Sequence, residues 1–173
     1  MSSAFSFNPA APHVAKFIEN NPNFDLSNSL LFLVENYSGQ EWIIEGGVAV
    51  RHYVGEQRIE PHDLDIVCLD KQMQADFNGS MYFDVKELDF WMSGKRLETQ
   101  AGLWSYIMST SVMANIHGVD VRLMSPAIIA AGKSFGYFGR PLRDKDITDI
   151  RMLGLSEQEI NMARQRLSTP TLE

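Results

Sequence analysis

The sequence has a single cysteine, Cys68, among its 173 residues, and it has no long hydrophobic run. One cysteine excludes an internal disulfide and is typical of the reducing cytoplasm, where we expect this protein to reside. The longest uninterrupted apolar run, residues 30–34, spans five residues, whereas a membrane helix needs about 20. Residues 1–5 contain neither a basic group nor a long apolar stretch, so we expect no secretory signal and no contact with a membrane.

Positive charge is also scarce, with 15 Lys and Arg residues against 22 Asp and Glu residues and a net charge of −7. Because contacts to a nucleic-acid backbone need clustered Lys and Arg, this balance argues against a general polyanion binder. A local basic cluster near the C-terminus is the exception, formed by Arg140, Arg143, Lys145 and Arg151. The histidines lack the spacing of zinc ligands, which argues against a zinc site.

What the sequence contains is the composition of an ordinary globular domain, with 45% hydrophobic and 21% charged residues. Its length predicts one domain over residues 1–173, with a core at about 40–125 and a helical part at about 126–168. Residue patterns predict an α/β (α+β) fold, in which helices flank a small mixed β-sheet and the C-terminal third is helical.

Individual elements follow from periodicity and from turn residues. Strands are predicted at 42–45, 64–69 and 119–123, and extended segments at 82–85 and 88–92. Helices are predicted at 13–20, 25–35, 46–54, 71–77, 126–133, 145–153 and 156–167. For residues 103–112 the pattern leaves strand and helix open.

Two short motifs point to chemistry. Asp63 and Asp65 lie two residues apart in a predicted strand, so both side chains point to one face and repel each other unless a cation lies between them. The usual cation for such oxygen ligands is Mg²⁺. Gly46 and Gly47 follow the first strand and open a helix, where bare backbone N–H groups can bind an anion. Together the motifs suggest a site for a metal and a nucleotide.

This order of strand, glycine pair, helix and Asp-x-Asp strand resembles the DNA polymerase β-like nucleotidyltransferase superfamily, and within it the AbiEii-type toxin group. Arg58 and His62 precede the aspartates much as an Arg and a Ser or Thr do in that group. The spacer from Gly47 to Asp63, residues 48–62, is at the long end for the superfamily. A second match is the helix that carries Lys133, followed by Arg143 and the segment Lys145-Asp146-Ile147-Thr148-Asp149.

The resemblance implies Mg²⁺- or Mn²⁺-dependent transfer of a nucleotide from an NTP to an RNA, tRNA among them, or to a protein. It also implies an antitoxin protein as a partner. Asp63 and Asp65 would bind the metal, with Asp120 as the third catalytic and metal-binding carboxylate. Gly46, Gly47, Lys133 and Lys145 would bind the nucleotide, and Asp146 and Asp149 would orient these lysines or contact the acceptor.

Each motif also has a structural interpretation. The glycine pair could form an ordinary tight turn, and the two aspartates could lie on a solvent-facing strand edge. Asp120 shares a strand face with Arg122 and could form an ion pair with it, while the acids of residues 145–149 suit the first turn of a helix. Arg51 and Arg58 are expected to be solvated. Two rival functions remain open: a catalytically silent member of the fold that binds a nucleotide or a protein, and an α/β module whose acidic strand binds a basic partner.

Overall fold

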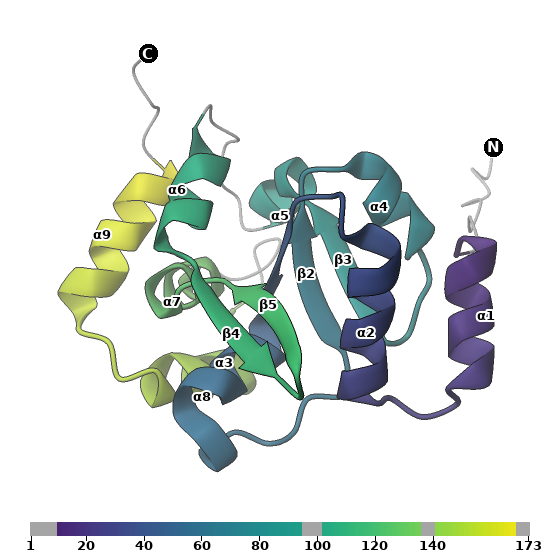
Figure 1. Ribbon diagram of the computed structural model, residues 1–173. Coiled ribbons are helices and arrows are strands. Elements are labelled where there is room, and N and C mark those ends of the chain that lie inside the picture. The colour runs from purple at the N-terminus through teal and green to yellow at the C-terminus, as the bar shows by residue number, and fades with distance from the viewer. Residues whose placement is uncertain (1–9, 95–101, 136–140, 169–173) are drawn as a thin grey trace, which may run out of the picture.

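A five-stranded mixed sheet with the strand order β3-β2-β1-β5-β4 forms the centre of the fold (Figure 1). The computed structural model describes residues 10–94, 102–135 and 141–168, and the statements below refer to these residues. The strands are β1 (Trp42–Glu45), β2 (Leu64–Cys68), β3 (Phe83–Glu87), β4 (Val112–Ile116) and β5 (Val119–Leu123). β1 pairs antiparallel with β2 and parallel with β5, β2 pairs parallel with β3, and β4 pairs antiparallel with β5.

Helices precede, connect and follow these strands. They are α1 (Pro12–Asn20), α2 (Leu26–Tyr37), α3 (Gly46–Val54), α4 (Lys71–Asp76), α5 (Leu88–Gly94), α6 (Leu103–Thr110), α7 (Pro126–Ser134), α8 (Asp144–Met152) and α9 (Glu157–Ser168), with the short 3-10 helix η1 (Gly55–Gln57) after α3. The predicted mixed α/β fold with a helical C-terminal third is confirmed.

One part of the core is a cluster of aromatic rings between the N-terminal helices and the sheet. Phe32 of α2 stacks on Phe17 of α1, with their ring centroids 4.4 Å apart. The ring centroid of Phe83 in β3 lies 5.9 Å from that of Phe32 and 4.8 Å from that of Phe77, the residue after α4. Each such ring pair stabilises the fold by about 0.5–1.5 kcal/mol beyond the contribution of its buried apolar surface. They fix α1, α2 and α4 against β3.

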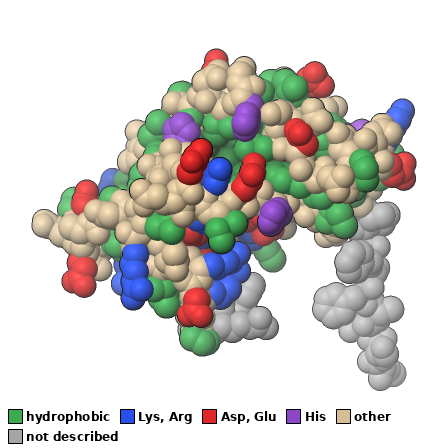
Figure 2. Space-filling model, turned by 90° about the horizontal axis from the view of Figure 1, so that it is seen from below, with side chains coloured by type: hydrophobic (Ala, Val, Ile, Leu, Met, Phe, Trp, Pro, Cys, Tyr) green, Lys and Arg blue, Asp and Glu red, His purple; other side chains and the backbone are tan. Residues whose placement is uncertain are grey.

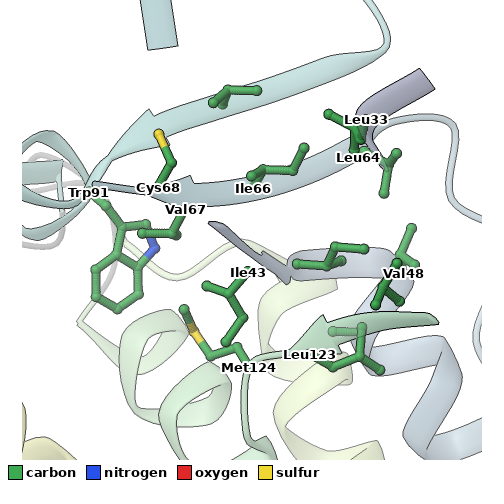
Figure 3. Packing of buried hydrophobic residues seen from close by; sticks show 14 of the residues in the cluster. Leu33, Ile43, Val48, Leu64, Ile66, Val67, Cys68, Trp91, Leu123 and Met124 are labelled. Carbon is green, nitrogen blue, oxygen red and sulfur yellow. The ribbon is translucent and has the colours of Figure 1, made fainter. Parts of the chain in front are cut away.

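Residues from several elements pack together in the rest of the core. Ile43 of β1 is paired with Val67 of β2, and both are fully buried. Trp91 of α5 lies beside Val67, and Met124 lies on the other side of Ile43 (Figure 3). Because side chains alternate along a strand, Glu45 and Asp65 lie on the same sheet face as this apolar group, one step further along.

The C-terminal helices pack against one another, since α7 contacts both α8 and α9. Ser156 and Glu159 form a capping box at the start of α9. The Ser156 hydroxyl accepts a hydrogen bond from the Glu159 N–H, and the Glu159 carboxylate accepts from the Ser156 N–H at 2.8 Å.

Two sequence predictions need correction. The segment 88–92 is not extended but belongs to α5, since its buried residues Leu88, Trp91 and Met92 have helical spacing. β4 was not predicted, because it follows directly on α6 and most of its residues are exposed. The segment left open, 103–112, is helical to Thr110 and enters β4 at Val112.

None of the helices within the described ranges is both long and apolar enough to cross a membrane.

Candidate active site

Three acidic residues lie side by side on neighbouring strands. In the strand register Glu45 of β1 is opposite Asp65 of β2, and Asp65 is opposite Asp84 of β3. In an antiparallel pair such as β1 and β2, residues directly opposite each other have their Cβ atoms about 4.5–5.5 Å apart on one face of the sheet. We call Glu45, Asp65 and Asp84 the acidic row. Asp63 precedes β2 and is exposed.

The acidic row concentrates negative charge on one face of the sheet, where Glu45 is buried, Asp65 is half-buried and Asp84 is exposed. Burial, together with the nearby carboxylates of Glu45, Asp63 and Asp84, raises the pKa of Asp65 to about 6, although Lys86 acts in the opposite direction. Glu45 is buried and accepts a hydrogen bond of 2.8 Å from the indole Nε1–H of Trp91. The row is therefore a place where a bound cation would relieve repulsion.

Lys86 lies two residues after Asp84 on β3 and forms an ion pair with it. Burial lowers the pKa of Lys86, but the carboxylates of Glu45, Asp84 and Asp65 outweigh this, so the net shift is upward. Its ammonium is the positive charge that accompanies the row.

The glycine pair lies against Asp65. Gly46 has φ +64°, and a Cβ atom there would lie 1.8 Å from Oδ2 of Asp65. The backbone N–H of Gly47, in the first turn of α3, donates to the same oxygen at 3.3 Å. The pair therefore lets the start of α3 approach the carboxylate closely. The predicted phosphate contact of these glycines stays a prediction.

These groups line one cavity of about 750 Å³, and basic residues line the same cavity. The acidic residues that line the cavity are the three of the acidic row, Asp63, and Glu60 on the segment between η1 and β2. We call Arg58, Lys133, Arg143 and Lys145 the basic wall, which also lines the cavity. Acidic and basic side chains occur close together on the face of the molecule shown in Figure 2.

Two buried aspartates hold most of the basic wall in place. Asp146 of α8 accepts hydrogen bonds from Lys133 of α7 at 2.9 Å and from Arg143 at 2.6 Å. Asp149, one helical turn further on, pairs with Lys133 at 3.1 Å and with Arg58. Burial raises the pKa of Asp146, but the hydrogen bonds from Arg143 and Lys133 outweigh it and the pKa is lowered overall.

This network refines the sequence interpretation. Asp146 and Asp149 are each only 1% exposed, so they are more than the acids of an exposed helix start. Arg58 was expected to be solvated, and the structure corrects this by placing it in an ion pair with Asp149. Lys145 is exposed at the cavity. Arg140 lies outside the described residues.

Asp120 lies elsewhere. It is exposed near the start of β5 and accepts a hydrogen bond of 2.7 Å from Asn115, and it is not among the residues that line the cavity. β5 runs parallel to β1, with Leu123 opposite Ile44, so Asp120 lies three residues back along the strand, about 10 Å. Arg122 donates to Ser111 at 2.8 Å.

Sequence reasoning missed the acidic residue beside Asp65, which is Asp84. Its signal was present, because the segment Phe83–Glu87 alternates buried and more exposed residues directly after the Asp-x-Asp strand. The contributions of Glu45 and Lys86 become visible only in the strand register, which brings residues from three strands to one level.

Within the described ranges, no three His, Cys, Asp or Glu side chains are grouped closely enough to hold a metal ion by themselves. Mg²⁺ in nucleotide enzymes commonly takes one or two carboxylates and completes its shell with phosphate oxygens and water. Asp63 and Asp65 at an acidic row fit that second kind of site, in which the nucleotide supplies part of the ligands.

Comparison with known proteins adds little. No protein-family model and no curated protein matches the sequence. Among solved structures, the fold is similar to the crystal structure of an antigenic nucleotidyltransferase-like protein from Paracoccidioides brasiliensis. The TM-score is 0.48 and the identity 18%, over 90% of this chain and 87% of that chain. A likeness this weak carries no argument about activity, which has to be argued from the site itself.

Proposed function

We propose that this protein is a nucleotidyltransferase that uses an NTP together with Mg²⁺ or Mn²⁺. The observation that carries the proposal is the cavity in which the acidic row and Asp63 occur together with the basic wall. A metal–triphosphate complex needs both, since carboxylates bind its cation while Lys and Arg bind its phosphates.

Asp63 and Asp65 are the proposed metal ligands. A metal held by these two carboxylates would help to neutralise the negative charge that develops on the phosphates during transfer. Asp84 takes the place proposed from sequence for Asp120, because it lines the cavity directly beside Asp65. It is exposed, so an acceptor hydroxyl can approach its carboxylate and give up a proton to it.

The basic wall is proposed to bind and orient the triphosphate. Lys133 is buried and held by Asp146 and Asp149, so its ammonium has a fixed position at the cavity. Fixed charges cost little reorganisation when a substrate binds. Lys145 lines the cavity from an exposed position on α8, where it can approach a phosphate as the nucleotide enters.

The identity of the acceptor is a finer proposal and depends on the sequence resemblance to the AbiEii-type group. The proposed acceptor is an RNA, tRNA among them, or a protein. This protein would then act as a toxin that an antitoxin protein neutralises. The basic residues at the cavity support a polyanionic acceptor, although the whole chain carries a net charge of −7.

One observation favours a second candidate, a catalytically silent protein that binds a nucleotide or a partner protein. Asp84, the proposed proton acceptor, is paired with Lys86. If that pair persists when a nucleotide binds, Asp84 is blocked. Binding without transfer is then the expected behaviour.

The test is incorporation from each of four α-labelled NTPs, with Mg²⁺ and total cellular RNA, by the wild type, D65N and D120N. Asp65→Asn removes a charge at the cavity, whereas Asp120→Asn removes one at an exposed position of β5 outside the cavity and serves as the matched control. Label transferred to RNA or to the protein itself by the wild type and D120N, but not by D65N, would establish the enzyme and its nucleotide. NTP binding that requires Mg²⁺, without transfer under any condition, would favour the silent candidate. Absence of both would refute the proposal.

A further inference from the structure

Resting on the proposed function, we propose that Lys86 is a built-in counter-cation of the acidic row and determines when a divalent metal can bind. With the Lys86 ammonium in place, the site has low affinity for a free metal ion. A nucleotide that draws the ammonium toward its phosphates opens the site, so metal and nucleotide bind together.

The strand register carries the first step. Lys86 follows Asp84 by two residues on β3, so both side chains point to the face of the sheet that bears Asp65. Lys86 is directly opposite Val67, one step along from the pair of Asp65 and Asp84. Its side chain therefore extends from an apolar position toward the carboxylates and ends in the ion pair with Asp84.

Burial carries the second step. The Lys86 side chain is only 15% exposed, against 51% for Asp84. A shielded ammonium interacts strongly with nearby carboxylates, because water screens it less. Glu45 and Asp65 both act on Lys86 electrostatically besides Asp84, so one ammonium serves the entire acidic row.

A divalent metal and this ammonium compete for the same charges. If Lys86 stays in its ion pair with Asp84, a metal bound to Asp65 would be repelled by the nearby ammonium. The metal would also find fewer carboxylate oxygens free to bind it. Lys86 also lines the cavity, so a triphosphate there offers its ammonium another anion.

The experiment measures Mn²⁺ binding by electron paramagnetic resonance, without nucleotide and with an ATP analogue that has a methylene group between the α- and β-phosphates. Lys86→Gln removes the ammonium, Lys86→Arg keeps the charge, and Lys145→Gln removes a charge at the same cavity that has no ion pair with the acidic row. Circular dichroism and thermal unfolding confirm that each variant is folded.

We expect K86Q to bind Mn²⁺ without nucleotide at least tenfold more tightly than the wild type, and K86R and K145Q to stay within about threefold of it. The factor by which the ATP analogue tightens Mn²⁺ binding should shrink correspondingly in K86Q. Nucleotide-free Mn²⁺ binding by K86Q no tighter than that of the wild type would overturn the inference, as would an equal gain in K86R or K145Q.

If K86Q does not fold, the double variant with Glu45→Gln and Lys86→Gln keeps the net charge of the acidic row and Lys86 taken together, and it is compared with E45Q alone. The double variant should again bind Mn²⁺ at least tenfold more tightly, and equal affinities would refute the role of Lys86. The nucleotide-free measurement does not depend on the activity. Failure of the wild type to bind the analogue would count against the proposed function, whereas an unchanged Mn²⁺ affinity in K86Q counts against Lys86.

Discussion

Gly46 and Asp65 are in contact in a way that leaves no room for a side chain at residue 46, since a Cβ there would lie 1.8 Å from the carboxylate oxygen Oδ2. The contact joins the end of β1 to β2 and places the start of α3 at the proposed metal ligand. Gly46 also has φ +64°, which side chains of other residues disfavour.

Gly46→Ala should therefore destabilise the protein by about 2 kcal/mol or more, through both the clash and the backbone strain. The free energy of unfolding in urea measures this. Gly39→Ala is the matched control, because a Cβ at Gly39 meets nothing within 4 Å. Equal stabilities of G46A and G39A would show that the start of α3 can move away from Asp65.

Asp65 makes the stability depend on pH. Its pKa is raised from 3.8 to about 6, so between these values the folded state binds the proton more tightly than the unfolded state. The contribution of Asp65 to stability therefore falls as the pH rises from about 4 to about 6 and stays low above that. The difference is on the order of 3 kcal/mol.

Urea unfolding of the wild type and D65N at several pH values, without divalent metal, tests this. D65N should gain stability relative to the wild type as the pH rises through that window. A constant difference between the two proteins would mean that Asp65 titrates normally.

Removal of Asp146 should be costly. Asp146→Ala removes one of the two carboxylates that pair with the buried Lys133, and it also removes the carboxylate that pairs with Arg143. Loss of a buried ion-pair partner typically costs about 3–5 kcal/mol of stability. Asp144→Ala is the control, because Asp144 is exposed on the same helix. Chemical denaturation should show a large loss for D146A and a much smaller one for D144A. Similar losses would mean that the network contributes little.

The choice of third carboxylate can be tested by activity. Asp84→Asn should lower the metal-dependent transfer rate by about 100-fold or more, since general-base catalysis contributes about 10²–10⁴-fold. Asp120→Asn should leave the rate within about twofold, because its carboxylate bonds to Asn115 and lies outside the cavity. The reverse ranking in initial-rate assays would restore the role predicted for Asp120 from sequence.

Local patterns predicted much of the fold. The strands at 42–45 and 119–123 and the helix start at Pro126 have strong local signals. These are adjacent isoleucines in the first strand, apolar and polar alternation in the second, and a proline in the first helical turn. α5 was wrongly predicted as extended, because a segment as short as 88–92 that contains several apolar residues fits a strand as well as a helix. The burial of Leu88, Trp91 and Met92 at helical spacing, with Trp91 beside Val67 and bonded to Glu45, is a feature of the folded chain.

The site was predicted in part, for a physical reason. Gly46 is next to Gly47 in the sequence, and Asp63 is two residues from Asp65, so each pair forms a local motif that the sequence alone reveals. The acidic row depends instead on register between strands, and the pair of Arg58 with Asp149 on contact between residues 91 positions apart. Spacing along the chain carries no information on either.

Most of the basic wall enters the protein later in synthesis than the acidic row, since only Arg58 precedes Asp84 in the sequence. The acidic row is complete once residue 84 has left the ribosome, whereas Lys133, Arg143 and the aspartates that hold them come from the last third of the chain. A chain that ends before α7 lacks Lys133, Arg143 and Lys145 of the basic wall. We therefore expect such a chain to bind a triphosphate more weakly than the complete protein.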